Sequence, residues 1–109
     1  MTKSAAYRPV ATINLLWVRK DGSEVPVVGQ IGEPYKLDEL SWACPAELKG
    51  VDPQYPDIQG GSAMQAVCLA IRLIKTRLGH LLDDDECIYE VENLTEKLDK
   101  AYLDIVFAS

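Results

Sequence analysis

The sequence lacks any long hydrophobic run. The longest uncharged stretch in its helix-like part, Gly60 to Ile71, contains Ser62 and Gln65 and falls short of the ~20 apolar residues that cross a bilayer. The first residues, Met1 to Ala6, carry one lysine and lack the apolar centre of a secretory signal. We therefore expect no membrane-spanning segment and a cytoplasmic protein.

Cysteine and histidine are also scarce. The three cysteines, Cys44, Cys68 and Cys87, are odd in number, widely spaced and form no CxxC pair, which excludes a disulfide framework and a zinc motif. We expect them to be reduced and to behave as small apolar residues.

Any Ser–His–Asp or Cys–His arrangement must use His80, the single histidine. His80 lies near the expected C-terminus of a helix, where a cationic side chain complements the helix dipole. This structural role explains the histidine, so we expect no catalytic residue and no enzyme.

Basic residues are in deficit. Eleven lysines and arginines against seventeen acidic residues give a net charge of −6 and a pI near 4.6. Nucleic acids and anionic membranes are bound mainly through Lys and Arg, so neither is an expected partner. Gly60-Gly61-Ser62 before a helix lacks the lysine of a phosphate-binding loop, which favours a simple helix start, and we expect no cofactor.

The 109 residues suit one domain, in which residues 1–8 show no pattern and are expected to be disordered. Val10 to Lys20 alternates and predicts a strand with apolar side chains on both faces, covered on both over part of its length. Asp21-Gly22 predicts a type I′ hairpin turn into a second strand, Ser23 to Ile31.

Tyr35 to Leu48 predicts a third strand, interrupted by Asp38-Glu39 and ended by Gly50. Pro26 and Pro45 lack an N–H, so each should lie at a sheet edge or a bulge. Residues 51–61 read as a loop in which Tyr55 to Ile58 could add a short strand.

Two helices are expected after the strands. Ser62 and Gln65 form a capping box, and the apolar pattern continues to about Leu78–Leu82, with Gly79 either just past the helix or inside it. Cys87 to Glu92 alternates weakly and could be a strand. Asn93 or Thr95 should cap the second helix, with a Glu96–Lys100 ion pair. The order predicts an α+β fold: an antiparallel β-meander followed by a long amphipathic helix and a shorter C-terminal helix.

Two stretches resemble a family. Trp42-Ala43-Cys44-Pro45, followed by Glu47 to Gly50, and then Gly61-Ser62-Ala63-Met64-Gln65-Ala66 at a helix start, resemble a small bacterial domain family of unknown function with a W-x-C-P strand. The resemblance covers about residues 10–80. It implies similarity to toxin-associated immunity proteins of bacteria.

The negative charge is concentrated at the end of the chain. Residues 1–82 carry nine basic and eight acidic side chains, whereas residues 83–109 carry two basic and nine acidic ones. Asp83 to Glu86 lacks the alternating ligands and the glycine of a calcium loop, so we expect no metal site. The remaining interpretations are a solvated loop that aids solubility and a surface that binds a basic partner. The predicted partner-binding residues are Asp83, Asp84, Asp85, Glu86, Tyr89, Glu90 and Glu92.

These observations lead to one main hypothesis and one alternative. The main hypothesis is an immunity or inhibitor protein that binds a basic bacterial toxin, such as a nuclease, and occludes its active site. The alternative is an acidic, homodimeric secretion chaperone for an effector protein. Such a chaperone should have an N-terminal helix and an apolar dimer surface.

Overall fold

The computed structural model of the chain describes residues 7–107. Eight strands and two helices occur in these residues. Their bounds are β1 Pro9–Val18, β2 Glu24–Gly32, β3 Tyr35–Asp38, β4 Ser41–Cys44, β5 Ala46–Lys49, β6 Ile58–Gly60, α1 Ala63–Asp83, β7 Cys87–Glu90, β8 Asn93–Lys97 and α2 Lys100–Phe107.

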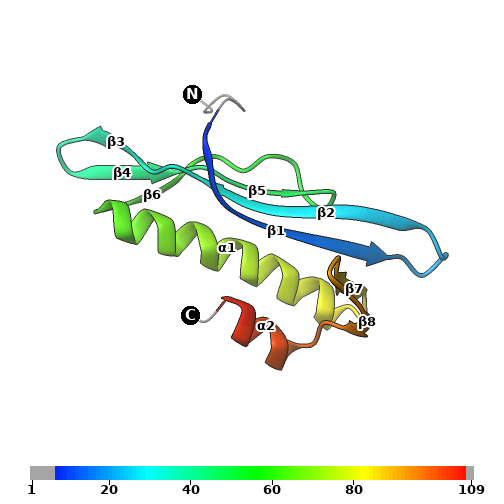
Figure 1. Cartoon of the computed structure of the whole chain (residues 1–109). Helices are drawn as coiled ribbons and strands as arrows, with labels where there is room; N and C mark the ends of the chain where they lie inside the picture. Colours follow the sequence, from blue (N-terminus) through cyan, green and yellow to red (C-terminus); the bar gives the residue numbers. More distant parts are fainter. Residues whose placement is uncertain (1–6, 108–109) are drawn as a thin grey trace.

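The strands form two antiparallel sheets, and both helices lie on one side of them. The larger sheet has five strands in the order β5-β2-β1-β7-β8, and the smaller has three in the order β3-β4-β6. Figure 1 shows α1 running along beneath both sheets, with α2 beside its C-terminal half. The molecule is elongated, 47 × 26 × 23 Å. The predicted α+β arrangement, strands first and a long helix before a short one, is confirmed.

The first hairpin forms as predicted, but its turn is of another type. Gly22 has a φ of +91°, whereas Asp21 does not have a positive φ, so the turn cannot be type I′. The backbone N–H of Gly22 donates to the Arg19 carbonyl at 2.9 Å, and Arg19 N–H donates to the Ser23 carbonyl at 2.8 Å. The Asp21 carboxylate accepts from the Ser23 backbone N–H at 2.9 Å, which holds Asp21 in an ordinary conformation.

The expected third strand is interrupted after Asp38, as predicted, and it is divided a second time at Pro45. β3 and β4 form a hairpin of the smaller sheet, and Pro45 separates β4 from β5, which pairs with β2 in the larger sheet. The chain therefore changes sheets at Pro45, whose carbonyl accepts from the Gly32 N–H at 2.9 Å. Pro26 lies in β2, but β5 pairs only with Val28 to Ile31, so Pro26 is at a local edge as predicted.

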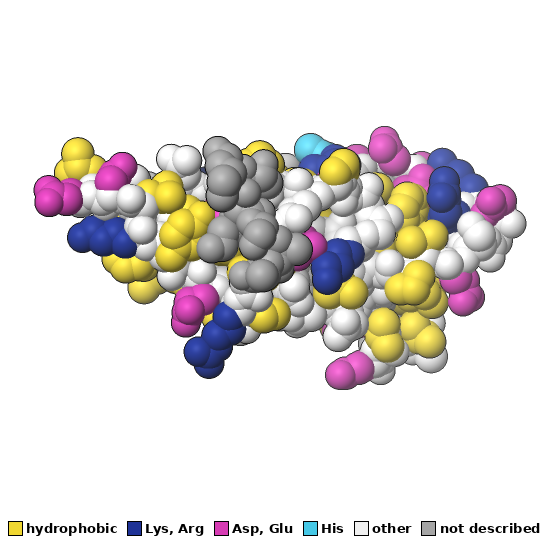
Figure 2. All heavy atoms as spheres, turned by 90° about the horizontal axis from the view of Figure 1, so that it is seen from above, with side chains coloured by type: hydrophobic (Ala, Val, Ile, Leu, Met, Phe, Trp, Pro, Cys, Tyr) yellow, Lys and Arg dark blue, Asp and Glu magenta, His cyan; other side chains and the backbone are white. Residues whose placement is uncertain are grey.

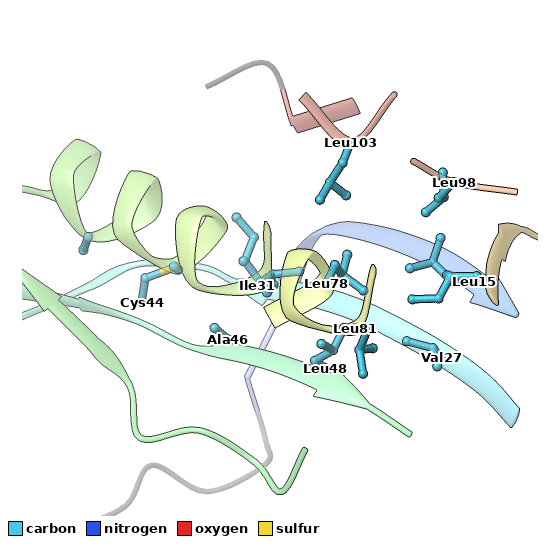
Figure 3. Close-up of a cluster of buried hydrophobic side chains, with 14 residues drawn as sticks. Leu15, Val27, Ile31, Cys44, Ala46, Leu48, Leu78, Leu81, Leu98 and Leu103 are labelled. Atoms are coloured by element: carbon cyan, nitrogen blue, oxygen red, sulfur yellow. The ribbon is translucent and has the colours of Figure 1, made fainter. Parts of the chain in front are cut away.

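The long helix carries the core. Ser62 caps α1, since its Oγ accepts from the Gln65 N–H at 3.0 Å, and the Gln65 side chain accepts from the Gly61 N–H at 2.5 Å. The residues of α1 that face the sheets recur at helical spacing: Ala66, Ala70, Ile74, Leu78 and Leu81. Figure 3 shows Leu78 and Leu81 directed toward Leu15, Val27 and Leu48 of the larger sheet.

The second helix begins later than predicted. Residues 93–97 form β8, which pairs with β7, so neither Asn93 nor Thr95 caps a helix. The cap is Asp99, whose Oδ1 accepts from the Tyr102 N–H at 2.8 Å. The expected Glu96–Lys100 pair is replaced by Lys100–Asp83, at 2.9 Å between Nζ and Oδ1. Strand pairing and a contact between distant residues thus override the local helical pattern.

The N-terminal prediction covers residues of two kinds. Residues 1–6 lie outside the described part of the chain. Tyr7 and Arg8 are held in place: the Tyr7 hydroxyl donates to Glu47 and accepts from Gln30 Nε2, and the Arg8 carbonyl accepts from the Glu33 N–H at 2.8 Å. Tyr7 and Arg8 thus have hydrogen-bond partners in β5, β2 and the turn that follows β2.

Gly50 gives a test of the link between β5 and the loop that follows it. Its φ is +92°, and a Cβ at this position would collide with the Pro26 carbonyl oxygen. We expect Gly50→Ala to lower the free energy of unfolding by about 1–3 kcal/mol. Gly22→Ala is the matched control, because Gly22 has a φ of +91° but no atom within 4 Å of the added Cβ. Urea denaturation measures both variants. If Gly22→Ala lowers the free energy of unfolding as much as Gly50→Ala does, the close approach of Gly50 to the Pro26 carbonyl oxygen is not the cause of the loss.

Candidate protein-binding surface

The acidic segment, Asp83 to Glu86, begins at the last residue of α1, and two of its four carboxylates are engaged within the protein. Asp83 pairs with Lys100 of α2. The Glu86 carboxylate accepts from the Trp17 indole N–H at 2.9 Å and lies 3.8 Å from Lys20 Nζ. Asp83 and Glu86 therefore fasten the end of α1 to α2 and to the first hairpin.

The two central carboxylates, Asp84 and Asp85, have no such contact with any described residue. Asp84 is the C-cap of α1, and its backbone N–H donates to the His80 and Leu81 carbonyls. Asp85 has a φ of +60°, the left-handed conformation that Asp tolerates better than most residues. Both side chains are exposed, and within residues 7–107 neither has an ion-pair partner. The negative end of the α1 dipole adds to their charge.

Strand β7 separates the other predicted site residues onto different faces. Tyr89 lies opposite Leu16 in the pairing of β1 with β7 and is half-buried on the face turned away from the helices. Glu90 lies opposite the buried Leu15, on the helix side. There it accepts a hydrogen bond from the Tyr102 hydroxyl, which raises the pKa of Tyr102. Glu92 is exposed in the turn that follows. The seven predicted residues thus do not form one continuous surface.

Lysine side chains of the first hairpin, α1 and α2 neutralise part of the negative charge that residues 83–109 carry. Lys75 of α1 pairs with Asp104 of α2 at 2.9 Å, in addition to the pairs made by Asp83 and Glu86. Figure 2 shows acidic and basic side chains interspersed at the end of the molecule that bears the first hairpin. Among residues 83–107 the exposed carboxylates that have no ion pair within the described part of the chain include Asp84, Asp85, Glu92 and Glu96, and Asp84 and Asp85 are adjacent in the chain.

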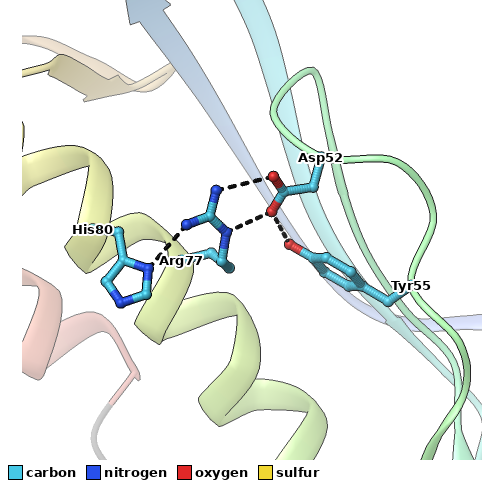
Figure 4. Close-up of polar contacts among 4 residues, drawn as sticks. All are labelled: Asp52, Tyr55, Arg77 and His80. Atoms are coloured by element: carbon cyan, nitrogen blue, oxygen red, sulfur yellow. Dashed lines mark hydrogen bonds and ion pairs between the residues drawn. The ribbon is translucent and has the colours of Figure 1, made fainter.

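His80 belongs to a polar network on the surface of α1. Arg77 makes two hydrogen bonds to Asp52, at 2.8 and 3.0 Å, and Tyr55 donates to the same carboxylate at 2.5 Å (Figure 4). His80 Nδ1 lies 2.9 Å from Arg77 Nη1. A guanidinium can only donate, so this contact is a hydrogen bond when Nδ1 is the acceptor. The network fastens the loop after β5 to α1, and His80 has no nucleophile beside it among the described contacts.

Asp52 and Arg77 predict a pH dependence of stability. The hydrogen bonds from Arg77 hold the pKa of Asp52 below its ordinary value. A lowered folded-state pKa stabilises the fold above the unfolded value of about 4, and this contribution is lost as the pH falls through the folded value.

Arg77→Gln should therefore lower the free energy of unfolding near neutral pH by about 1–2 kcal/mol and flatten its decline below about pH 4. Arg72→Gln, at an exposed position of the same helix, should leave both unchanged. Urea denaturation across the acid range measures this. An acid limb equally steep in Arg77→Gln would contradict the assignment.

The three cysteines form no disulfide within the described part of the chain. Cys44, Cys68 and Cys87 are all free, and burial raises the pKa of the Cys44 thiol to about 11. Only Cys44 is fully buried, and Cys68 is exposed on α1. Among residues 7–107 no three His, Cys, Asp or Glu side chains are grouped to hold a metal ion. Neither α1 nor α2 is long and apolar enough to span a bilayer.

The sequence did not identify an apolar patch on the outer face of the larger sheet. Both helices lie on the other face, so the expected double cover of β1 is not found among the described residues. Figure 2, which looks onto this outer face, shows hydrophobic side chains gathered over its right half. The outer patch consists of Leu16, Val18, Pro26, Val28, Cys87 and Tyr89. The apolar residues in both alternating sets of β1 were the available signal.

Comparison of the chain with protein-family models, with curated proteins and with solved structures found no match. We therefore infer function from the charge and shape of the molecule itself.

Proposed function

We propose that this chain is a non-catalytic immunity or inhibitor protein of the bacterial cytoplasm that binds a basic protein toxin, such as a nuclease, and occludes its active site. One observation carries the proposal: Asp84 and Asp85 are exposed and unpaired at the negative end of a 21-residue helix, within the described residues. A nuclease binds a polyanion through a basic cleft, so a compact negative surface can compete for that cleft.

The neighbouring outer patch supplies packing for the same interface. β7 begins directly after the acidic segment, and its residues Cys87 and Tyr89 belong to the patch. A partner that contacts Asp84 and Asp85 can therefore extend its contact onto Tyr89 and Leu16. Aromatic side chains that become buried at an interface contribute much of its affinity, whereas exposed charges mainly raise the association rate.

The test is binding to the purified basic product of the gene adjacent to the one that encodes this chain. Stopped-flow association should slow about tenfold from low to high ionic strength, with a much smaller change in the dissociation rate. Catalysis by the partner should stop at one equivalent of this chain. A complex whose association rate is independent of salt would contradict electrostatic capture.

The homodimeric chaperone retains one supporting observation. The outer patch is the kind of uncovered apolar surface that such a dimer would bury. The first element of the described chain is β1, however, and the N-terminal helix of that class does not occur within residues 7–107. Light scattering distinguishes the two functions, because the inhibitor should be a monomer without its partner.

A further inference from the structure

Strand β1 has an edge that is paired over only half its length. On one side β2 pairs with β1 from Pro9 to Val18. On the other side β7 pairs only with Leu15 to Val18, and the last contact is the Val91 N–H that donates to the Asn14 carbonyl at 3.1 Å. No described residue pairs with this edge from Pro9 to Ile13.

The backbone groups that face the open edge can be assigned. In an antiparallel strand the N–H and C=O of one residue point to the same side, and successive residues alternate. Asn14 faces β7, so Thr12 also directs its N–H and C=O to this side, where they have no described partner. The Thr12 side chain lies on the outer face, 3.2 Å from Gln30 Oε1.

The open segment is protected only near its start, by Pro9 and by the register shift between Pro9 and Ala11. Pro9 blocks pairing at one end, but Val10 to Ile13 contains no charge and no proline. Val10 is 52% exposed. An uncharged stretch with free backbone groups can accept a further strand.

A cavity of about 350 Å³ lies beneath this edge. Its size is that of a small ligand pocket, and its lining is almost wholly uncharged. Ile71 and Ile74 of α1 form one wall, Ala11 and Ile13 of β1 another, and the end of α2 closes it with Phe107. A strand added to β1 would direct alternate side chains to the helix side, as Ala11 and Ile13 do, and so into the cavity.

Among residues 7–107, Glu90 is the only charged residue of the lining. Its carboxylate already accepts from Tyr102 and retains acceptor positions for a second donor. The charge complement is a lysine or arginine near the β7 end of the added strand.

A second copy of this chain fits the cavity less well than a partner segment. Pairing two β1 edges about a two-fold axis would bring Ala11 and Ile13 of each copy to the interface. In each copy those side chains already line the cavity of their own chain, and Ile13 packs closely on Gly29, where an added Cβ would lie 3.0 Å away. Neither side chain can therefore reach into the cavity of the other copy. Both cavities would remain empty and both Glu90 carboxylates would lack a cation.

We propose that the open edge of β1, with the cavity beneath it, binds an extended segment of a partner polypeptide that carries apolar residues at alternate positions and a lysine or arginine beside Glu90. The segment adds to the five-stranded sheet through the N–H and C=O of Thr12. This inference rests on the proposed function in one respect, namely that the segment belongs to the basic partner.

A symmetric peptide, acetyl-Lys-Thr-Ile-Thr-Ile-Thr-Lys-amide, tests the site in either strand direction. Titration of the ¹⁵N-labelled full chain should shift the amide signals of Val10 to Asn14 and of Ile71, and should slow hydrogen exchange of the Thr12 amide at least ~tenfold. Absence of shifts at millimolar peptide, or shifts elsewhere on the molecule, would overturn the proposal. A dimer without peptide whose Thr12 amide is already protected would assign the edge to a second copy instead.

Variants separate the parts of the site. Ala11→Glu places a charge in the apolar cavity and should weaken peptide binding at least ~tenfold, whereas Ala101→Glu, the same change at an exposed position of α2, should not. Glu90→Gln should weaken binding of this peptide. It should not weaken binding of the analogue in which norleucine replaces both lysines. If the basic partner binds Ala11→Glu as tightly as the wild type, the groove is not its site, and the proposed function stands. If the peptide docks but no basic partner binds, the proposed function fails alone.

Discussion

Association with the basic partner should slow about tenfold at low ionic strength when Asp84→Asn and Asp85→Asn are combined. These carboxylates have no described ion-pair partner, so their field reaches solvent uncompensated. Asparagine tolerates the left-handed backbone of Asp85, and the variant should fold as the wild type does. Stopped-flow measurements over a series of salt concentrations give the rate and its salt dependence together.

The matched control is Glu33→Gln with Glu39→Gln. It changes the net charge by the same amount, at exposed positions near the β3–β4 hairpin, remote from the acidic segment. Its association rate should change less than twofold. If both double variants slow association equally, net charge rather than the placement of Asp84 and Asp85 controls the encounter.

The largest loss of stability should follow Leu78→Ala. Leu78 is fully buried where α1 meets the larger sheet, and its truncation removes apolar contacts and leaves a cavity. Substitutions of this kind cost about 2–5 kcal/mol, which in a domain of this size lowers the melting temperature by at least ~10 °C. Calorimetry or thermal circular dichroism measures the change.

Leu40→Ala is the control for that result. Leu40 is 86% exposed in the turn between β3 and β4, so the same truncation removes no buried contact. The melting temperature should stay within ~2 °C of the wild type. A comparable loss at Leu40 would show that its side chain is buried in solution, and would contradict its position at the surface of the β3–β4 hairpin.

Local signals predicted the elements that depend on local chemistry. The Ser62 cap, the apolar stripe of α1 and the first hairpin all follow from residues close in the chain. The errors occur where distant contacts decide. Residues 93–97 have a helical pattern but pair with β7. Pro45 moves the chain from one sheet to the other, which a strand pattern spanning it cannot show.

The candidate surface was predicted in part for the same reason. Asp83 and Glu86 looked equivalent to Asp84 and Asp85 in the sequence, but their partners Lys100 and Trp17 come from other elements. Strand alternation, once β7 was expected, could have shown that Tyr89 and Glu90 face opposite sides. The half-paired edge of β1 depends on where β7 ends, and no residue of β1 reveals that.

The most direct test of the proposed function is hydrogen exchange of this chain, free and bound to its basic partner. We expect protection on binding to concentrate in residues 84–92 and at Leu16, and also at Thr12 where the partner's segment pairs with β1, with little change at the β3–β4 hairpin. A tight complex in which residues 84–92 exchange as fast as in the free protein would show that the acidic segment faces solvent, and would contradict the proposed function.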